Sequence, residues 1–156
     1  MKKITTTGEL YEEYISNMNK IADIRYASAV LQWDQETYLP IKGAQLRGQQ
    51  IATLSELSHE MFTSEGFYTL VKELSQREGL QAEQKKNVLL TLYDIEQQQK
   101  LSTALVREMS EAINTAFHQW VNARKENNFR VFENSLEKLN SLIIQESELL
   151  GYEEHP

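Results

Sequence analysis

Helical periodicity runs through almost the whole sequence and constrains the fold more than any other feature. From Leu10, apolar residues recur three or four positions apart through Tyr14, Met18 and Ile21, which is the spacing of one face of an α-helix. The chain has two prolines and six glycines in 156 residues, so few positions favour a tight turn or the end of a helix. The sequence therefore predicts an all-α protein.

Capping residues and breaks divide this pattern into about six mostly antiparallel helices. Thr6 and Glu9 have the spacing of a capping box, and the helix that they open is expected to end near Leu31. The other helices are predicted at 44–62, from a cap at Ser64 to near Gly79, at 82–99, from a cap at Ser102, and from Asn128 to a C-terminal cap at Gly151. Residues 1–156 contain no internal repeat and no obvious linker, so we expect a single helical unit.

The stretch 33–40 separates the first two predicted helices and combines aromatic with polar side chains. Asp34 and Gln35 are expected to satisfy backbone groups of a loop, while Trp33 and Tyr38 pack. Acid–base chemistry by Asp34 and Glu36 is the less favoured alternative, because no activated nucleophile or base is apparent nearby.

Arg47 lies on the apolar line of the second predicted helix. An unpaired cation is costly in such a position, and Asp34 or Glu36 is a suitable partner. We interpret Arg47 as one half of a structural ion pair rather than as a ligand contact.

Metal ligands are scarce in this chain, which has no cysteine and three histidines, His59, His118 and His155. A zinc-protease helix needs two histidines four positions apart with a glutamate after the first, and neither His59 nor His118 has that partner. Glu56 and His59 match the Glu-x-x-His element of di-iron bundles, but no second copy exists. His59 is therefore interpreted as a structural residue near an acidic side chain, and no metal-binding or catalytic residue is predicted.

Four aromatic residues surround the turn between the last two predicted helices. They are Phe117, Trp120, Phe129 and Phe132. Aromatic residues at a corner between helices are usually part of the core, so we expect them to be buried there. A binding site is the minority interpretation.

Charge and hydropathy exclude several classes of partner. The formal net charge of −7 repels polyanions, so nucleic acid is not expected to bind. No apolar run approaches the roughly 20 residues that span a bilayer, and the N-terminus lacks the apolar core of a secretory signal. A chain without cysteine is compatible with a reducing compartment, and a cytoplasmic location is expected.

Several segments occur in an order and at a spacing typical of one enzyme family. They are Trp33–Pro40, Ala44 and Arg47, Leu54, His59-Glu60, Trp120–Arg124, Asn127–Phe132 and Leu149–Pro156. Taken together, they resemble the start of the thermostable carboxypeptidase Taq family of zinc metallocarboxypeptidases. Leu39, Asn128 and Asn134 stand where the family usually has Met, Asp and Pro. The first two replacements preserve volume or capping ability.

The resemblance implies a mostly helical, zincin-type protein with a deep substrate groove, in which these helices form one wall or lid. It also implies a homodimeric, cytoplasmic enzyme that removes C-terminal residues from peptides. The family's enzymes are much longer, and their zinc-binding His-Glu-x-x-His helix lies in a part with no counterpart here. Zinc and peptide are therefore expected only in the full-length enzyme. The candidate structural or groove-lining residues of this chain are Trp33, Asp34, Gln35, Arg47 and His59.

Two hypotheses for the function follow. The first is the N-terminal wall or lid of such a carboxypeptidase, inactive by itself and completed by a C-terminal catalytic part or by self-association. The second is a stand-alone helical module for interaction or oligomerisation, without catalysis. Helices that belong to a larger protein should leave an apolar face exposed in the isolated chain, which predicts oligomerisation or poor solubility. A monodisperse monomer without a large exposed patch would favour the stand-alone module.

Overall fold

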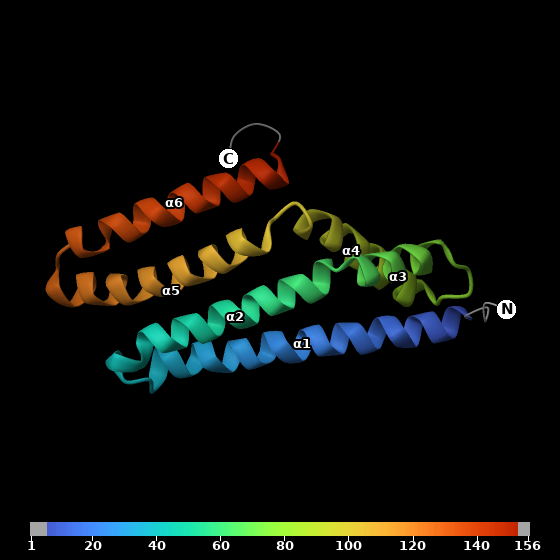
Figure 1. Ribbon diagram of the computed structural model, residues 1–156, viewed down its shortest axis with the longest axis horizontal. Helices are drawn as coiled ribbons and strands as arrows, with labels where there is room; N and C mark the ends of the chain where they lie inside the picture. Colours follow the sequence, from blue (N-terminus) through green and yellow to red (C-terminus); the bar gives the residue numbers. More distant parts are fainter. Residues whose placement is uncertain (1–5, 153–156) are drawn as a thin grey trace.

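The computed structural model describes residues 6–152 and contains helices but no strand in that range (Figure 1). The elements are α1 (Thr7–Thr37), the short 3-10 helix η1 (Ile41–Gly43), α2 (Ala44–Thr63), α3 (Glu65–Gln76), α4 (Ala82–Gln98), α5 (Thr103–Glu126) and α6 (Arg130–Leu150). The prediction of an all-α fold with six helices is confirmed. No helix among these residues is both long and apolar enough to cross a bilayer.

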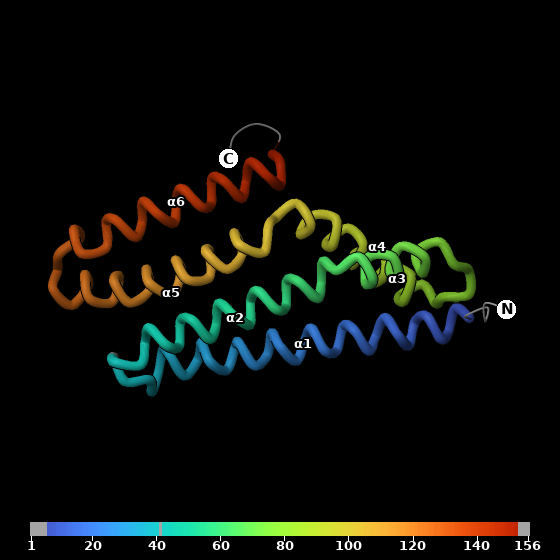
Figure 2. Tube along the Cα trace, in the orientation of Figure 1, coloured from blue at the N-terminus to red at the C-terminus, as the bar shows by residue number. Residues whose placement is uncertain are grey.

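The four long helices form a row in the order α1, α2, α5 and α6, and each runs antiparallel to the next (Figures 1 and 2). The α3–α4 hairpin lies at one end of the row, where it packs against the first half of α1 and the end of α2. In the part of the chain that the structure describes, α3 and α4 therefore cover only one end of the row.

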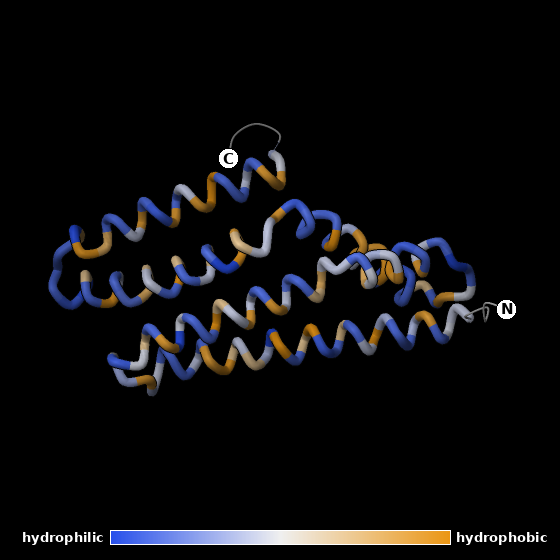
Figure 3. Tube along the Cα trace, viewed as in Figure 1, coloured by the Kyte–Doolittle hydropathy of each residue, from blue (hydrophilic) through white to orange (hydrophobic). Residues whose placement is uncertain are grey.

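Buried apolar side chains form two clusters at the contacts between these helices. Figure 3 shows hydrophobic and hydrophilic positions alternating along the helices. The larger cluster joins α1 to the end of α2 and to the α3–α4 hairpin, and it contains Leu10, Tyr14, Ile21, Phe62, Phe67, Leu70, Val71, Leu74, Val88 and Ile95. The smaller cluster lies between α5 and α6 around Leu101, Leu105 and Leu142. Within the larger cluster, the Tyr14 hydroxyl lies 2.9 Å from Oγ1 of Thr91 on α4.

Helix α1 is longer than predicted. It continues through Thr37, and the backbone amides of Tyr38 and Leu39 both donate to the carbonyl of Asp34 at 2.9 Å. The prediction that the helix ends near Leu31 was wrong, and of the predicted break at 33–40 only residues 38–40 lie outside the helix. Proline excludes the helical conformation mainly for the residue immediately before it, so Pro40 acts on Leu39 and leaves 33–37 free to remain helical.

The predicted N-terminal caps of α1, α3 and α5 are confirmed. The backbone amide of Glu9 donates to Oγ1 of Thr6 at 3.2 Å, and the Glu9 carboxylate accepts from the Thr6 amide at 2.8 Å. Ser64 and Ser102 each accept a hydrogen bond from the backbone amide three residues ahead. Each cap satisfies a backbone donor that the first helical turn leaves without a partner.

The turn between α5 and α6 differs slightly from the prediction. Asn127 adopts the left-handed conformation with φ of 48° and ends α5. Asn128 does not occupy the N-cap position of α6, which Phe129 takes, but its Oδ1 accepts from the amide of Arg130 at 3.2 Å. Gly151 has the positive φ expected of a residue that ends a helix, and α3 ends at Gln76, before the predicted Gly79.

Candidate functional site

Helix α2 lies between α1 and α5, and polar side chains connect it to both. Toward α1, Nη1 of Arg47 lies 2.6 Å from Oδ2 of Asp34 and donates to the carbonyl of Leu31 at 3.0 Å. The Arg47 side chain is only 16% exposed, so this pair compensates a largely desolvated cation. The predicted ion pair between Arg47 and Asp34 is confirmed. Asp34 acts from within a helix, contrary to the prediction that it serves loop backbone.

A second polar contact links α1 directly to α5 across α2. Nδ2 of Asn114 on α5 donates to Oε1 of Gln35 on α1 at 2.8 Å, and Asn114 is buried. Asn114 lies against Gly48 of α2, where an added Cβ would be 2.8 Å from Oδ1 of Asn114. The absence of a side chain at Gly48 thus creates the room for Asn114, and Gln35 has a role that its predicted place in a loop did not suggest.

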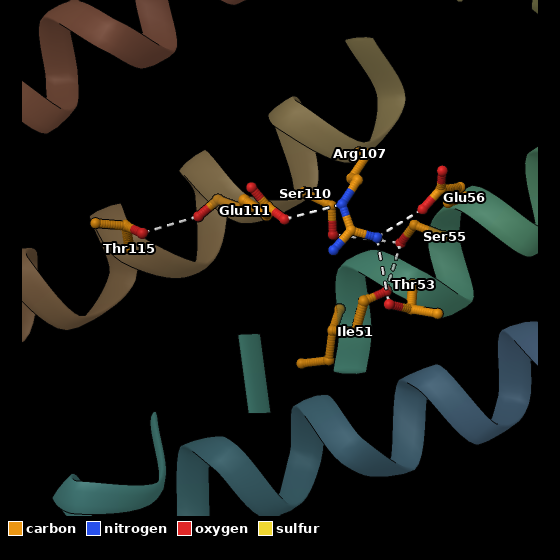
Figure 4. Close-up of polar contacts among 8 residues, drawn as sticks. All are labelled: Ile51, Thr53, Ser55, Glu56, Arg107, Ser110, Glu111 and Thr115. Carbon is orange, nitrogen blue, oxygen red and sulfur yellow. Dashed lines mark hydrogen bonds and ion pairs between the residues drawn. The ribbon is translucent and has the colours of Figure 1, made fainter. Parts of the chain in front are cut away.

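Arg107 of α5 is the centre of the polar contact with α2 (Figure 4). Its guanidinium group lies 2.6 Å from the Glu56 carboxylate on α2 and 3.1 Å from Glu111 on its own helix, and it donates to Thr53 at 3.3 Å. The hydrogen bond to Glu56 is the main reason that the pKa of Arg107 is raised. Because the guanidinium group is planar and carries five donors, it holds several acceptors in fixed directions. Arg107 therefore fixes the register of α2 against α5.

His59 is buried in α2, and its Nε2 lies 3.0 Å from the carbonyl of Leu101, just before α5. The prediction that His59 has a structural role agrees with this contact. The expected acidic neighbour differs, because Glu56 is held by Arg107 rather than by His59.

The described residues do not fit the zinc that the family resemblance implies. Within 6–152, no group of three or more His, Asp or Glu side chains is placed to hold a metal ion. Glu56 and His59 are engaged elsewhere, as described above. His118 has a buried Nε2 without a hydrogen-bond partner in this part of the chain, but it belongs to no such group, and His155 lies outside the described residues.

A recess opens between α1, α2 and α5, which we name the central recess. It consists of two adjoining hollows of about 340 Å³ each, which share Gln32, Ser55 and Val106. The first hollow is mostly polar and is lined by Arg25, Ser28, Ser58, His59, Phe62 and Gln98, among others. The second is lined largely by apolar side chains of α2 and α5, together with Gln35, Glu36 and Asn114.

The inner face of α1 changes character where the α3–α4 hairpin ends. Leu10, Tyr14 and Ile21 pack into the larger apolar cluster, whereas Ser28, Gln32 and Gln35 on the same face line the central recess. Residues seven or eleven apart lie on one face of a helix. The sequence of this face thus follows its surroundings, apolar where α3 and α4 cover it and polar where it is open.

A different face of α1 carries a row of exposed apolar residues, which we name the outer stripe. Tyr26, Val30 and Trp33 have i, i+4, i+7 spacing and are 58–72% exposed. Trp33 contacts Tyr38 edge-on, with ring centroids 5.5 Å apart, but both rings remain exposed. Such a row on one face is the exposed apolar surface expected of helices that belong to a larger assembly.

The aromatic corner between α5 and α6 is not the buried core that the sequence predicted. Trp120 is 46% exposed and Phe129 is 58% exposed. With Phe132 and Arg124, they border an open concavity of about 670 Å³. Among the described residues only α5 and α6 meet at this corner, so no third element covers the rings.

The structure distributes the five candidate residues over three places. Gln35 and His59 line the central recess, Asp34 and Arg47 form an ion pair between α1 and α2, and Trp33 lies on the outer stripe. Arg25 was not predicted. Its position in one helical line with Ser28, Gln32 and Gln35 is the signal that could have identified it.

Known proteins with similar sequences and structures define the class to which this helical array belongs, the metallopeptidases. The sequence profile of the family described as carboxypeptidase Taq (M32) metallopeptidase matches residues 13–156, so the chain belongs to this family of metallocarboxypeptidases. Thermostable carboxypeptidase 1 of Pyrococcus furiosus is 31% identical over 149 residues, which cover 96% of this chain and 30% of that protein.

Solved structures agree with this assignment. The structure named BsuCP covers 94% of this chain with a TM-score of 0.91 at 27% identity, and the one named CHT covers 95% with a TM-score of 0.72 at 50% identity. This chain spans about 30% of the length of each.

Proposed function

We propose that this chain forms the N-terminal helical wall, or lid, beside the substrate groove of a zinc-dependent metallocarboxypeptidase, and that it is inactive by itself. The observation that carries the proposal is the outer stripe. Three large apolar residues, each more than half exposed, occupy one face of α1 in a chain that spans about 30% of the length of its relatives. Burial of such a surface against further protein is favourable by roughly 25 cal/mol per Å² of apolar area.

The chemistry of the described residues supports the second half of the proposal. Glu56, Asp34 and Glu111 are committed to ion pairs with Arg107 or Arg47, and residues 6–152 offer no group able to bind a metal. In this proposal the zinc ligands and the peptide-cleaving groups come from the remaining part of the family architecture. This chain contributes shape and polar surface.

A chimaera tests the proposal directly. The segment of Pyrococcus furiosus thermostable carboxypeptidase 1 that matches this chain is replaced by residues 1–156, and release of C-terminal amino acids from peptides is measured with and without a zinc chelator. We expect chelator-sensitive activity from the chimaera and none from the 156-residue chain alone. Activity of the chain alone would refute the proposal, as would a folded chimaera without activity.

A stand-alone oligomerisation module is the second candidate, and the outer stripe also favours it. In that case the stripe would be covered by a second copy of the chain. Sedimentation of the purified chain, compared with Trp33→Glu and with Glu13→Gln as a matched control on the same helix, distinguishes the two. A discrete dimer that Trp33→Glu converts to a monomer supports the module, whereas poor solubility or association without a defined stoichiometry supports the wall.

A further inference from the structure

The first hollow of the central recess contains a cation without an anionic partner. Among the described arginines, Arg107, Arg77 and Arg47 each pair with a carboxylate, whereas Arg124 and Arg130, like Arg25, have no such pair within this part of the chain. Arg25 has no carboxylate within ion-pair distance among the described residues, and none of the residues that line its hollow is acidic. Arg25 is itself exposed at the border of this hollow, so its charge can be reached from solvent.

The guanidinium group of Arg25 is held in place by two neighbours. Its Nε donates to Oγ of Ser58 on α2 at 3.1 Å, and its Cζ lies 5.1 Å from the centroid of the Phe62 ring. A hydrogen bond through Nε and a cation–π contact fix the plane of the group and leave the two Nη atoms free to donate. This is the geometry in which arginine binds a carboxylate with two parallel hydrogen bonds.

The surroundings of Arg25 complete a site for more than a bare anion. Gln32 and Gln98 border the same hollow with side-chain amides, which can donate to a carboxylate or pair with a peptide group. Beyond Gln32, the second hollow presents Ile51, Met109 and other apolar side chains, and its border also includes the carboxylate of Glu36. The recess thus places a cation and amide donors beside an apolar surface.

We propose that the central recess binds a peptide carboxylate, with Arg25 as its anchor and the second hollow as the place of the adjoining apolar group. The carboxylate is either the C-terminal carboxylate of a released amino acid or peptide, or the side chain of Asp or Glu in an extended peptide. The role of the site in the enzyme rests on the proposed function, because a groove wall meets peptide substrate and product. The binding itself is a property of this chain, so its test does not depend on activity.

The experiment follows the backbone amide signals of the 156-residue chain by NMR during titration with three probes. N-acetyl-leucine carries a C-terminal carboxylate, N-acetyl-glutamic acid α-amide carries only a side-chain carboxylate, and N-acetyl-leucinamide carries none. We expect shifts around Arg25 and Ser58 with at least one carboxylate probe and at least about tenfold weaker binding of N-acetyl-leucinamide, the range of a charge-assisted hydrogen bond at a partly exposed site. The tighter of the two carboxylates identifies the source.

Matched variants assign the site. Arg25→Gln should weaken carboxylate binding at least about tenfold, whereas Arg25→Lys retains the charge but not the two-pronged geometry and should have an intermediate effect. Arg124→Gln is the control, because Arg124 also lies over an aromatic ring, that of Trp120, but borders a different concavity. It should leave shifts around Arg25 unchanged.

Two results would overturn the proposal. One is equal binding of N-acetyl-leucinamide and N-acetyl-leucine, and the other is unchanged binding in Arg25→Gln. Circular dichroism of each variant verifies that it is folded, and Ser58→Ala provides a second variant should Arg25→Gln unfold. Loss of the hydroxyl that holds Nε should weaken binding less than loss of Arg25 itself, and tighter binding by Ser58→Ala would contradict the assigned geometry.

Discussion

The position of Gly48 against Asn114 predicts that Gly48→Ala destabilises the wild-type protein but stabilises a variant that lacks the Asn114 side chain. In Gly48→Ala the new Cβ would lie 2.8 Å from Oδ1 and 3.0 Å from Cγ of Asn114, closer than van der Waals contact allows. Asn114 is buried and bonded to Gln35, so its amide cannot rotate away without losing that hydrogen bond. The alanine therefore strains the packing of α2 against α5 and displaces Asn114 from its hydrogen bond with Gln35.

The magnitude is the difference of three effects. Overpacking costs about 1–3 kcal/mol, and loss of the hydrogen bond from Asn114 to Gln35 costs about 1 kcal/mol. Alanine in place of glycine within a helix returns about 1 kcal/mol. We expect Gly48→Ala to lower the free energy of unfolding by about 1–3 kcal/mol. In an Asn114→Ala background the obstacle is gone, and the same substitution should stabilise the protein by up to about 1 kcal/mol.

The four proteins of this double-mutant cycle are compared by urea unfolding, monitored by far-UV circular dichroism. We expect a coupling energy between positions 48 and 114 of about 2 kcal/mol or more. Stabilisation by Gly48→Ala in the wild-type background would refute the argument. The same effect of Gly48→Ala in both backgrounds would also refute it, because the two residues would then not be in contact.

Two further predictions concern single residues. Asp34→Asn removes the charged partner of Arg47, whose side chain is 16% exposed, and should lower the free energy of unfolding in urea by about 1–2 kcal/mol. Glu36→Gln is the control and should have little effect. Equal effects of the two substitutions would contradict the assigned pair. Burial raises the pKa of Tyr14, although its hydrogen bond with Thr91 acts in the opposite direction. The stability that depends on neutral Tyr14 is therefore present below the pKa of an unfolded tyrosine, about 10, and is lost as the pH rises through the higher folded pKa. Tyr14→Phe should cost about 1 kcal/mol near neutral pH, and its difference from wild type should shrink in alkaline solution; a difference that does not vary with pH would contradict this assignment.

Residues close together in the sequence accounted for most of the successful predictions of local structure. The capping box of Thr6 and Glu9, the caps at Ser64 and Ser102, and the positive φ of Gly151 are confirmed. Each depends on backbone groups only a few residues away. The error at 33–37 came from interpreting a stretch that mixes polar and aromatic residues as a break in the helix, although Pro40 restricts only the residue before it.

The site was predicted less completely, because it depends on which distant residues meet. The sequence identified Arg47 as a cation in need of a partner and Asp34 as a suitable one, and the structure contains that pair. The sequence does not show that Arg107, rather than His59, is the partner of Glu56. Nor does it show that Asn114 lies beside Gln35, which is 79 positions away. Arg25 was missed because an arginine on a long amphipathic helix is usually solvated, and only the position of α2 shows that it faces a recess.

The sequence by itself determined that this chain is helical, where its helices begin, and which family it resembles. Periodicity, capping and motif order depend only on the order of residues in the sequence, so they do not depend on how the helices are arranged in space. The tertiary structure alone decided which faces are covered. The α3–α4 hairpin lies over the first half of α1 and leaves Ser28, Gln32 and Gln35 in an open recess, while Tyr26, Val30 and Trp33 remain exposed. Burial is a property of contacts between distant segments, so a stripe that looks like core in the sequence becomes a surface where no partner lies against it.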